Sequence, residues 1–376
     1  MSKVAVLKTQ PDTVIEDYKR LLDLAEFERH IPKDKPVILK DNISWHFLFP
    51  GANTTPWQLE AVIQYLLDHG YTDISAVHNK TVVIDAPKGQ RLNRLDVVYR
   101  KYGIPELHNY DPAHMKWIVY KPKAKMLALD AIYPEGFRIP DYFVGKSIIH
   151  LPTVKCHIYT TMTGAMKNAF GGLLNTKRHY THSVIHATLC DLLAVQQEIH
   201  PGIFAVMDGT TCGNGPGPRC MAPERKDYIL ASADSVAIDC VSTHLMGLDP
   251  AKVKCVWKAG QLGLGCGKFD DIDVVGEDIS DVNFGFDVGA TFASRVGHLV
   301  WFGPLRRLQK LFFHTPIVYI FVLGSYLYHD YFWYPLKGKP ILREWLTTPW
   351  GQRFESYGAA EWAGEPGPAG KDTTPR

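Results

Sequence analysis

The sequence predicts an α/β fold in which a mostly parallel sheet carries helices on both faces. Short apolar runs alternate with helical patterns over the first 80 residues, as expected for consecutive βαβ units. The chain is also 376 residues long and 46% hydrophobic, which is enough for a large buried core. We therefore expect two α/β lobes around a cleft, followed by a helical, aromatic C-terminal extension.

The helix that follows Thr55 is the clearest element in the first part of the chain. Thr55 is a suitable N-cap, Pro56 occupies the first helical position, and Gln58 stands where a capping box requires Glu or Gln. Gly70 is a typical helix end. The elements expected around this helix are strands at 4–7, 37–39 and 74–77 and a helix at 12–28.

The pattern is weaker between residues 81 and 140, which are rich in lysine and proline and are interpreted as an excursion from the core. The core pattern then resumes with further strands and helices. We assign 1–290 to the α/β domain, 291–357 to the extension and 358–376 to a disordered tail. The later elements are strands at 144–151, 204–207, 228–231 and 273–275 and helices at 183–199, 234–245 and 249–260.

Composition and charge indicate which partners and which cellular compartment to expect. The net charge is +2, and no basic stripe interleaved with aromatic residues appears before the last quarter, so nucleic acid is not an expected partner. Residues 1–8 already resemble a first strand instead of a secretory signal. Seven cysteines, an odd number without any C-x-x-C spacing, argue against a disulfide framework. These features favour a cytoplasmic protein.

The extension combines basic, apolar and aromatic segments. Arg306, Arg307 and Lys310 precede an uncharged stretch at 311–328, and an aromatic run follows at 331–334. This order favours the interface of a membrane over a complete crossing. Two interpretations stay open: peripheral membrane contact through 297–335 on the inner face of the membrane, or packing against the core or a homo-oligomer partner.

Residues 151–172 carry the strongest site pattern. Two lysines, a histidine and an asparagine stand among small residues just after an apolar run that Pro152 is expected to end. Ligands bind at such strand ends in open α/β sheets. The lysines would hold an anion, and His157 would act as a general acid or base or as a structural donor. The candidate catalytic residues are Lys155, His157, Lys167, Asn168 and Asp208, and the candidate substrate-binding residues are Asn42, Thr54, Thr55, Gly164, Gly171 and His182.

A second group could hold a divalent metal. His182 and His186 would lie one helical turn apart on the same face. Asp208 ends a predicted strand ahead of a glycine-rich loop, where it could pair with a lysine, ligate a metal or cap the loop. The expected metal ligands are His182, His186 and Asp208. The alternative is a solvent-facing helix start with no metal.

Together these motifs resemble the family known as domain of unknown function 362, over roughly residues 3–265. The family includes members fused to ferredoxin-like modules, but the cysteine runs of such modules are absent here, so an iron–sulfur cluster is not expected. The resemblance implies no settled activity. Its carriers are Lys40-Asp-Asn42, Gly51, Thr54-Thr55-Pro56, Leu151-Pro152, Lys155, His157, Gly164-Ala-Met-Lys167-Asn168-Ala-Phe-Gly171, the His182 region, Asp208-Gly209, Gly215-Pro216, Asp234–Asp239 and Met246-Gly247.

The leading functional hypothesis is an enzyme that acts on a small anionic organic substrate by redox or isomerase-type chemistry. Lys155 and Lys167 would hold the anion, His157 would move a proton and Asn168 would orient the substrate. Two other classes stay open. One is a non-catalytic ligand-binding or membrane-associated scaffold protein, and the other is an iron–sulfur electron-transfer protein.

Overall fold

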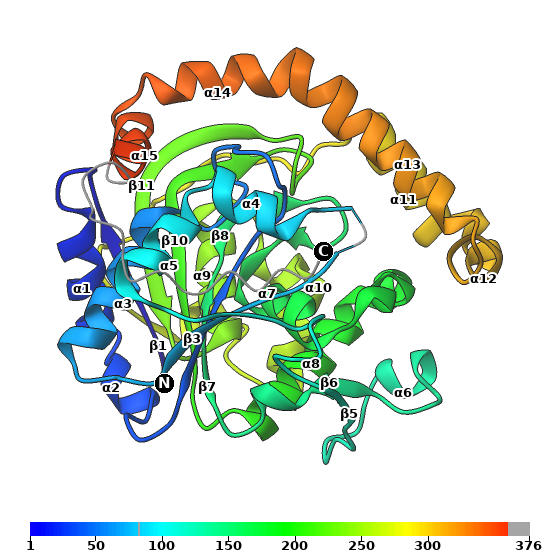
Figure 1. Cartoon of the computed structure of the whole chain (residues 1–376), viewed down its shortest axis with the longest axis horizontal. Coiled ribbons are helices and arrows are strands. Elements are labelled where there is room, and N and C mark those ends of the chain that lie inside the picture. Colours follow the sequence, from blue (N-terminus) through cyan, green and yellow to red (C-terminus); the bar gives the residue numbers. More distant parts are fainter. Residues whose placement is uncertain (82, 360–376) are drawn as a thin grey trace, which may run out of the picture.

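The computed structural model describes residues 1–81 and 83–359 and contains one large, mostly parallel sheet with helices on both faces (Figure 1). This confirms the predicted fold class. The strands on both sides of the 81–140 excursion belong to this one sheet, and only β11 runs antiparallel to both of its neighbours. In order across the sheet the strands are β12 (Ile272–Gly276), β1 (Ser2–Lys8), β11 (Ala222–Ser232), β10 (Ile203–Asn214), β7 (Ser147–Leu151), β2 (Val37–Asp41), β3 (Ile74–His78) and β4 (Glu106–His108).

Two layers of helices bury the two faces of the sheet. Alternate strand residues point to opposite faces, so Phe204 and Val206 of β10 join one apolar core while Ala205 and Met207 join the other. The first core lies under α1 (Val14–Leu24), α3 (Pro56–Asp68), α5 (Leu95–Tyr102) and α15 (Pro349–Ala359). The second lies under α7 (Gly164–Leu173), α8 (Ile185–Ile199), α9 (Ser235–Leu245) and α10 (Lys254–Gln261).

Helix α3 begins as its sequence predicts. Thr55 is the N-cap, and the capping box with Gln58 is formed in both directions. The Gln58 amide also donates to the carbonyl oxygens of Pro152 (3.0 Å) and Val206 (2.7 Å). The residue that completes the cap therefore also fixes the helix to the sheet.

Three predictions about the course of the chain are wrong. Pro152 does not turn the chain, because pairing resumes at once in β8 (Thr153–His157), which pairs with β10 and with the short β9 (Thr161–Met162). The expected loop after Asp208 is instead the second half of β10, held by antiparallel pairing with β11 and a register shift at Gly209. The helix expected at 12–28 breaks at Glu26, where φ is +54°, into α1 and the short α2 (Phe27–His30).

Residues 81–140 contain short elements beside the sheet. Helix α5 from this segment packs in the first core, whereas a separate two-stranded sheet lies lower in the view of Figure 1. The remaining elements of the segment are α4 (Ala86–Leu92), β5 (Trp117–Val119), α6 (Leu129–Ile132) and β6 (Arg138–Pro140).

The C-terminal segment arches over the molecule and returns to the first core at α15 (Figure 1). Within the described residues no single helix has the length and apolar composition of a membrane span, whereas the helical stretches 304–313 and 318–346, bent by 99° at their junction, satisfy both criteria only as a pair. The segment consists of α11 (Phe292–Trp301), a 3₁₀ turn (Pro304–Leu308), α12 (Gln309–Phe313), α13 (Val318–Tyr326), a π-helical stretch (Leu327–Gly338), α14 (Lys339–Leu346) and α15. Residues 360–376, most of the expected tail, lie outside the described residues.

Candidate functional site

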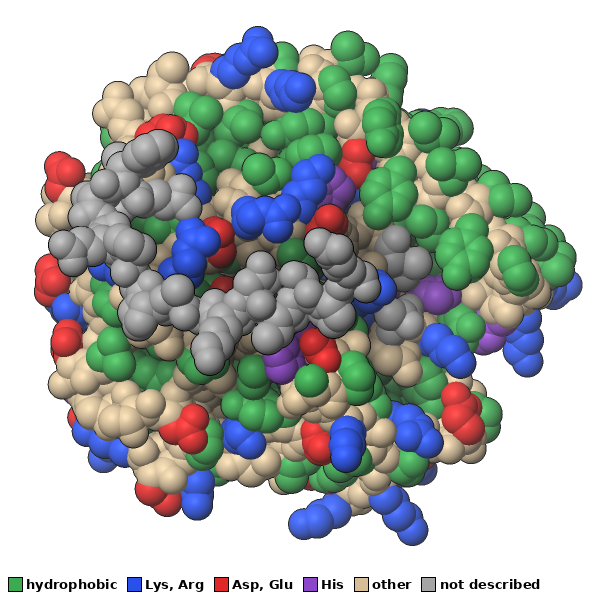
Figure 2. Space-filling model, in the orientation of Figure 1, with side chains coloured by type: hydrophobic (Ala, Val, Ile, Leu, Met, Phe, Trp, Pro, Cys, Tyr) green, Lys and Arg blue, Asp and Glu red, His purple; other side chains and the backbone are tan. Residues whose placement is uncertain are grey.

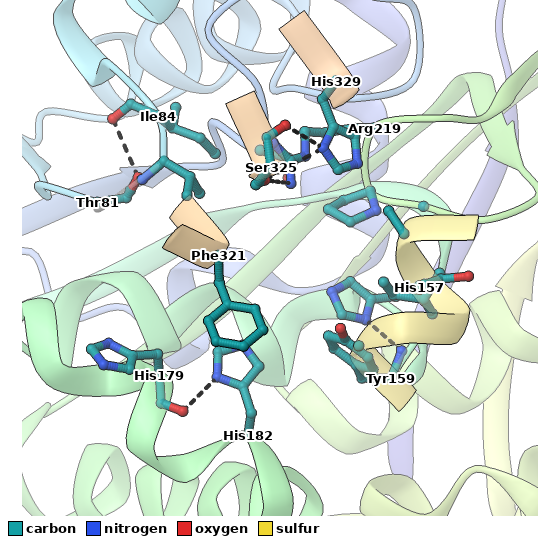
Figure 3. A pocket seen from close by; sticks show the side chains of 18 of the residues that line it. Thr81, Ile84, His157, Tyr159, His179, His182, Arg219, Phe321, Ser325 and His329 are labelled. Atoms are coloured by element: carbon teal, nitrogen blue, oxygen red, sulfur yellow. Dashed lines mark hydrogen bonds between the residues drawn. The ribbon is translucent and has the colours of Figure 1, made fainter. Parts of the chain in front are cut away.

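A cavity of about 590 Å³ opens where the carboxyl ends of β2 and β8 meet the C-terminal segment (Figure 3). Lys40 and Asp41 end β2, and His157 ends β8. This is the end of a parallel sheet at which ligands bind in doubly wound folds. Six of the predicted site residues line the cavity: Asn42, His157, Lys167, Asn168, Gly171 and His182.

Lys155 lies one layer behind the lining and is fully buried. Its ammonium nitrogen donates to Asn42 Oδ1 (2.5 Å), the carbonyl oxygen of Ala52 (2.5 Å) and Thr153 Oγ1 (2.9 Å). Burial lowers the pKa of Lys155 well below its usual range. With its three donors already used, Lys155 positions other groups instead of contacting a ligand.

The group that Lys155 holds is a pair of amides. Asn42 Nδ2 donates to Asn168 Oδ1 (3.2 Å), and Asn168 Nδ2 donates to the carbonyl oxygen of Lys40 (2.7 Å). These bonds set the direction of each amide at the cavity wall. Asn168 therefore lies in the site as predicted, and Asn42 links it to the buried lysine.

The hydrogen bonds of His157 define its tautomer. Its Nδ1 accepts from the backbone N–H groups of Tyr159 (3.1 Å) and Thr160 (3.4 Å). Burial, with Lys167 as the next cause, keeps the pKa of His157 well below 6.5, so the ring is neutral and carries its proton on Nε2. His157 can therefore donate a hydrogen bond into the cavity.

In His182 the donor and acceptor nitrogens of the ring are exchanged relative to His157. Its Nδ1 donates to the carbonyl oxygen of His179 (2.9 Å), and burial lowers its pKa to about 4. The neutral ring then carries a lone pair on Nε2. Stacking against Trp301 of α11, with ring centres 5.0 Å apart, holds this ring in place.

Cationic side chains outnumber acidic ones around the cavity. Lys40, Lys167, Arg178 and Arg219 line it, and Asp41 is the only acidic residue among the described lining residues. Asp41 is already paired with His78 (3.3 Å) and Lys40 (3.5 Å), which outweigh the opposing effect of burial and lower its pKa to about 2. Burial lowers the pKa of Lys167 to about 8 and that of Arg178 to about 10. A ligand in the cavity is therefore expected to be anionic.

Arg178 carries the clearest unused donor. Its Nη1 atom is buried without a hydrogen-bond partner among the described residues. Arg219, by contrast, donates to Ser325 Oγ (3.0 Å) of α13 (Figure 3). Buried donors without partners are costly, so Arg178 is well placed to receive an anionic oxygen.

Asp208 does not join this site. It points to the first core, where its carboxylate accepts from Tyr18 (2.8 Å), Thr55 (2.9 Å), Trp57 (2.8 Å) and twice from Thr210 (2.7 and 3.0 Å). Burial raises its pKa. The prediction of Asp208 as a catalytic residue is corrected, because the strand continues past it and its side chain faces α1 and α3.

Thr54 and Thr55 also serve the scaffold. Thr54 Oγ1 donates to the carbonyl oxygen of Leu151 (2.6 Å) and accepts from the backbone N–H of Asn42 (2.7 Å). Thr55 caps α3 and donates to Asp208. Neither threonine lines the cavity, so their expected contact with substrate is replaced by support of the Asn42 loop.

Gly164 allows a carboxylate to cap α7. Its φ is +64°, and a Cβ atom there would lie 2.3 Å from Asp239 Oδ1. Asp239 accepts from the backbone N–H groups of Ala165 (2.5 Å) and Met166 (3.1 Å), and burial raises its pKa to about 8. The N-terminus of α7 is therefore filled by the protein itself and does not bind substrate.

The expected metal ligands are not assembled. His182 and His186 lie on the α8 side of the sheet, whereas Asp208 faces the other core, and no group of three or more His, Cys, Asp or Glu in residues 1–81 and 83–359 is placed to hold a metal ion. His182 belongs to a 3₁₀ turn and His186 to α8. All seven cysteines are free thiols, and Cys212 lies inside β10.

Several functional candidates escaped prediction from sequence. Arg219 follows a Gly-Pro-Gly-Pro run and comes to the cavity only because the β10–β11 hairpin is long. Lys40 belonged to the motif but not to the predicted site. Arg178, beside Lys177 and His179, carried a usable signal, since basic residues at a helix start suit an anion. Trp301 had no local signal.

Comparisons with known proteins identify the family of the chain and leave its activity undefined. No solved structure matches the chain. A thylakoid-associated protein of Synechocystis sp., sll1697, is 30% identical over 121 residues, which are 31% of this chain. The chain covers 37% of that relative's length. A family model matches residues 37–244, more than half of the chain, and therefore the protein belongs to the family described as domain of unknown function, DUF362.

Proposed function

We propose that this protein is an enzyme that binds a small anionic organic substrate in the cavity and moves a proton on it. The observation that carries the proposal is the excess of cations. Lys167, Arg178 and Arg219 face a cavity whose one described acidic lining residue is already paired. No carboxylate among the described residues forms an ion pair with any of the three. Burying cations in this way is costly, and an anionic ligand would offset that cost.

The two histidines favour isomerase-type chemistry over a purely binding role. His157 presents an N–H and His182 presents a lone pair, so His182 can accept a proton while His157 donates a hydrogen bond. Proton transfer at a carbon next to a carboxylate or carbonyl group requires a base for the C–H, and it is helped by a hydrogen-bond donor and nearby cations that stabilise the negative charge on the oxygen. Redox chemistry on the same substrate class is the second branch of the proposal.

Anion binding is tested by calorimetric titration with inorganic phosphate and a set of small 2-oxo and 2-hydroxy acids. Lys167→Met and Arg178→Met are expected to weaken binding at least tenfold, since each removes a charge that faces the ligand. Lys177→Met is the matched control, because Lys177 is exposed and adjacent to Arg178. Equal affinity in all variants would refute the assignment of the site.

Proton transfer is tested by nuclear magnetic resonance in deuterated water. The enzyme is expected to exchange the C–H next to the carboxylate or carbonyl group of a bound ligand, and His182→Gln is expected to abolish the exchange. His69→Gln, at the end of α3 on the other face of the sheet, is the control. Tight binding without exchange in any ligand would favour the non-catalytic alternative.

We also propose that the protein works on the inner face of a membrane as a peripheral protein. The apolar C-terminal helices support this, as does the name of the thylakoid-associated relative. Co-sedimentation of the purified protein with vesicles tests it, and protein that stays entirely in the supernatant would refute it.

A further inference from the structure

The cavity has two chemically different ends. The sheet supplies the polar end, where Lys167, Arg178 and His157 lie. The C-terminal segment supplies an apolar end. Its lining side chains are Val296, Val300, Trp301, Phe313, Val318, Ile320, Phe321 and Val322. A small, fully hydrated anion would fill the first end and leave the second empty.

A continuous row of rings joins the two ends. His182 stacks on Trp301 (5.0 Å between ring centres), Trp301 stacks on Phe313 (3.8 Å) and Phe313 contacts Phe321 of α13 (5.1 Å). Helix α11 also approaches closely at Gly297, where a Cβ atom would lie 2.0 Å from Tyr159 Oη. The apolar end is therefore a packed extension of the site and not a separate surface.

Helix α13 forms a wall that is one helix thick. It has no charged residue, yet none of its residues is buried within the described chain. Ile320 lines the cavity and is 69% exposed, and Leu323 is 58% exposed. A helix that is apolar on all sides is normally buried in protein or lipid, so the outer face of α13 requires a partner.

Basic residues accompany this apolar surface. Arg306, Arg307 and Lys310 are exposed just before α13, and Lys337 and Lys339 are exposed after it. Figure 2 shows hydrophobic side chains gathered over α13 and its neighbours on one side of the molecule. Apolar and aromatic side chains flanked by Lys and Arg are the pattern that binds the interface of an anionic bilayer.

We propose that the substrate is an amphiphile with an anionic head group and a long apolar tail, and that it enters from an anionic membrane surface on which α11 to α13 lie. The head group would contact Lys167, Arg178 and Arg219, and the tail would lie along Trp301, Phe313 and Phe321. The inference rests on the proposed function for the polar end and adds the class of substrate and its source.

The first test compares inorganic phosphate, butyl phosphate and octyl phosphate by calorimetric titration. A buried tail is worth on the order of fourfold in affinity per methylene, so octyl phosphate is expected to bind at least tenfold more tightly than butyl phosphate. Phe321→Ser is expected to remove most of this gain and to leave phosphate binding unchanged. Lys167→Met is expected to weaken the binding of all three ligands.

The outcomes of this test distinguish the proposed anion site from the proposed amphiphilic substrate. If none of the three phosphates binds, the proposed anion site itself is refuted. If phosphate binds and octyl phosphate binds no more tightly than butyl phosphate, the amphiphile inference is overturned while the anion site stands.

The second test asks whether the ligand comes from a membrane. The full chain is sedimented with phosphatidylcholine vesicles that contain roughly one quarter phosphatidylglycerol, and with vesicles of phosphatidylcholine alone. Binding is expected mainly to the anionic vesicles, and the double variant Leu323→Asp, Leu327→Asp is expected to lose it. Trp257→Asp is the matched control, since Trp257 is 52% exposed on α10. Equal sedimentation of the double variant and this control would overturn the membrane source.

Discussion

Replacing Lys167 by methionine removes a cation that has no carboxylate partner among the described residues. Burial, with Arg178 as the next cause, lowers the pKa of Lys167 from 10.5 to about 8. At 1.36 kcal/mol per pH unit, this corresponds to roughly 3 kcal/mol against the charged form in the folded state. The side chain is partly exposed to the cavity, so we expect Lys167→Met to raise the free energy of unfolding by about 1 to 2 kcal/mol at pH 7.

The sign of the effect follows from the two pKa values. Below about pH 8 the lysine is charged in both states, and the folded state carries the full cost. Above 10.5 it is neutral in both states, and the cost disappears. The gain from methionine should therefore fall to about a quarter of its pH 7 value by pH 10.

Urea unfolding at pH 7 and pH 10 measures this difference, with Lys177→Met as the exposed control that should change stability by no more than about 0.5 kcal/mol. If Lys167→Met is less stable than the parent protein at pH 7, or gains the same free energy of unfolding at both pH values, Lys167 is not an uncompensated cation. The variant should at the same time lose anion binding, so that stability and function move in opposite directions.

Three further predictions concern the scaffold of the site. Lys155→Met removes the Lys155 hydrogen bonds to the carbonyl oxygen of Ala52 and to Thr153 Oγ1, and leaves Asn42 Oδ1 with Ser44 as its donor. It should cost about 3 kcal/mol in urea unfolding and weaken phosphate binding roughly tenfold; unchanged phosphate affinity would contradict its positioning role. Gly164→Ala places a methyl group against the Asp239 carboxylate at a positive φ and should lower the free energy of unfolding by more than about 2 kcal/mol. Thermal unfolding measures this loss, and a variant as stable as the parent protein would contradict the close packing at Gly164. Trp350→Ala empties a fully buried position and should cost about 3 to 5 kcal/mol; a loss below about 1 kcal/mol would show that α15 is not part of the core.

Local signals predicted the fold well. The Thr55–Gln58 capping box depends on four consecutive residues, and it forms as expected. The order of strands and helices also follows from short apolar periods, which need no long-range partner. Lys167 and Asn168, which the motif placed together, also line the same cavity.

Predictions that depended on distant partners were less successful. Asp208 was assigned to a strand end, but pairing with β11 prolongs the strand through Gly209 and Gly213, and the side chain then faces the first core. The sequence around Lys155 is typical of a ligand-binding lysine. Only the positions of Asn42 and Ala52 in the structure show that the N–H donors of its side chain are already used. In both cases the deciding residues lie outside the local sequence: Ile229 of β11 pairs with Asp208, and Asn42 and Ala52 are 113 and 103 positions from Lys155.

The C-terminal segment is attached to the rest of the molecule on both sides of α13. Before α13, Trp301 stacks on His182. After it, Asp330 accepts from the indole N–H of Trp45 (2.8 Å), and Trp333 and Tyr334 are buried in the same apolar cluster as Trp45. Helix α13 itself has no buried residue, so it is the part of this stretch that can move most easily. Any force on the outer face of α13 therefore changes the width of the apolar end of the cavity while both anchors stay in place. The cavity would in this way respond to the pressure and packing of whatever lies against that helix.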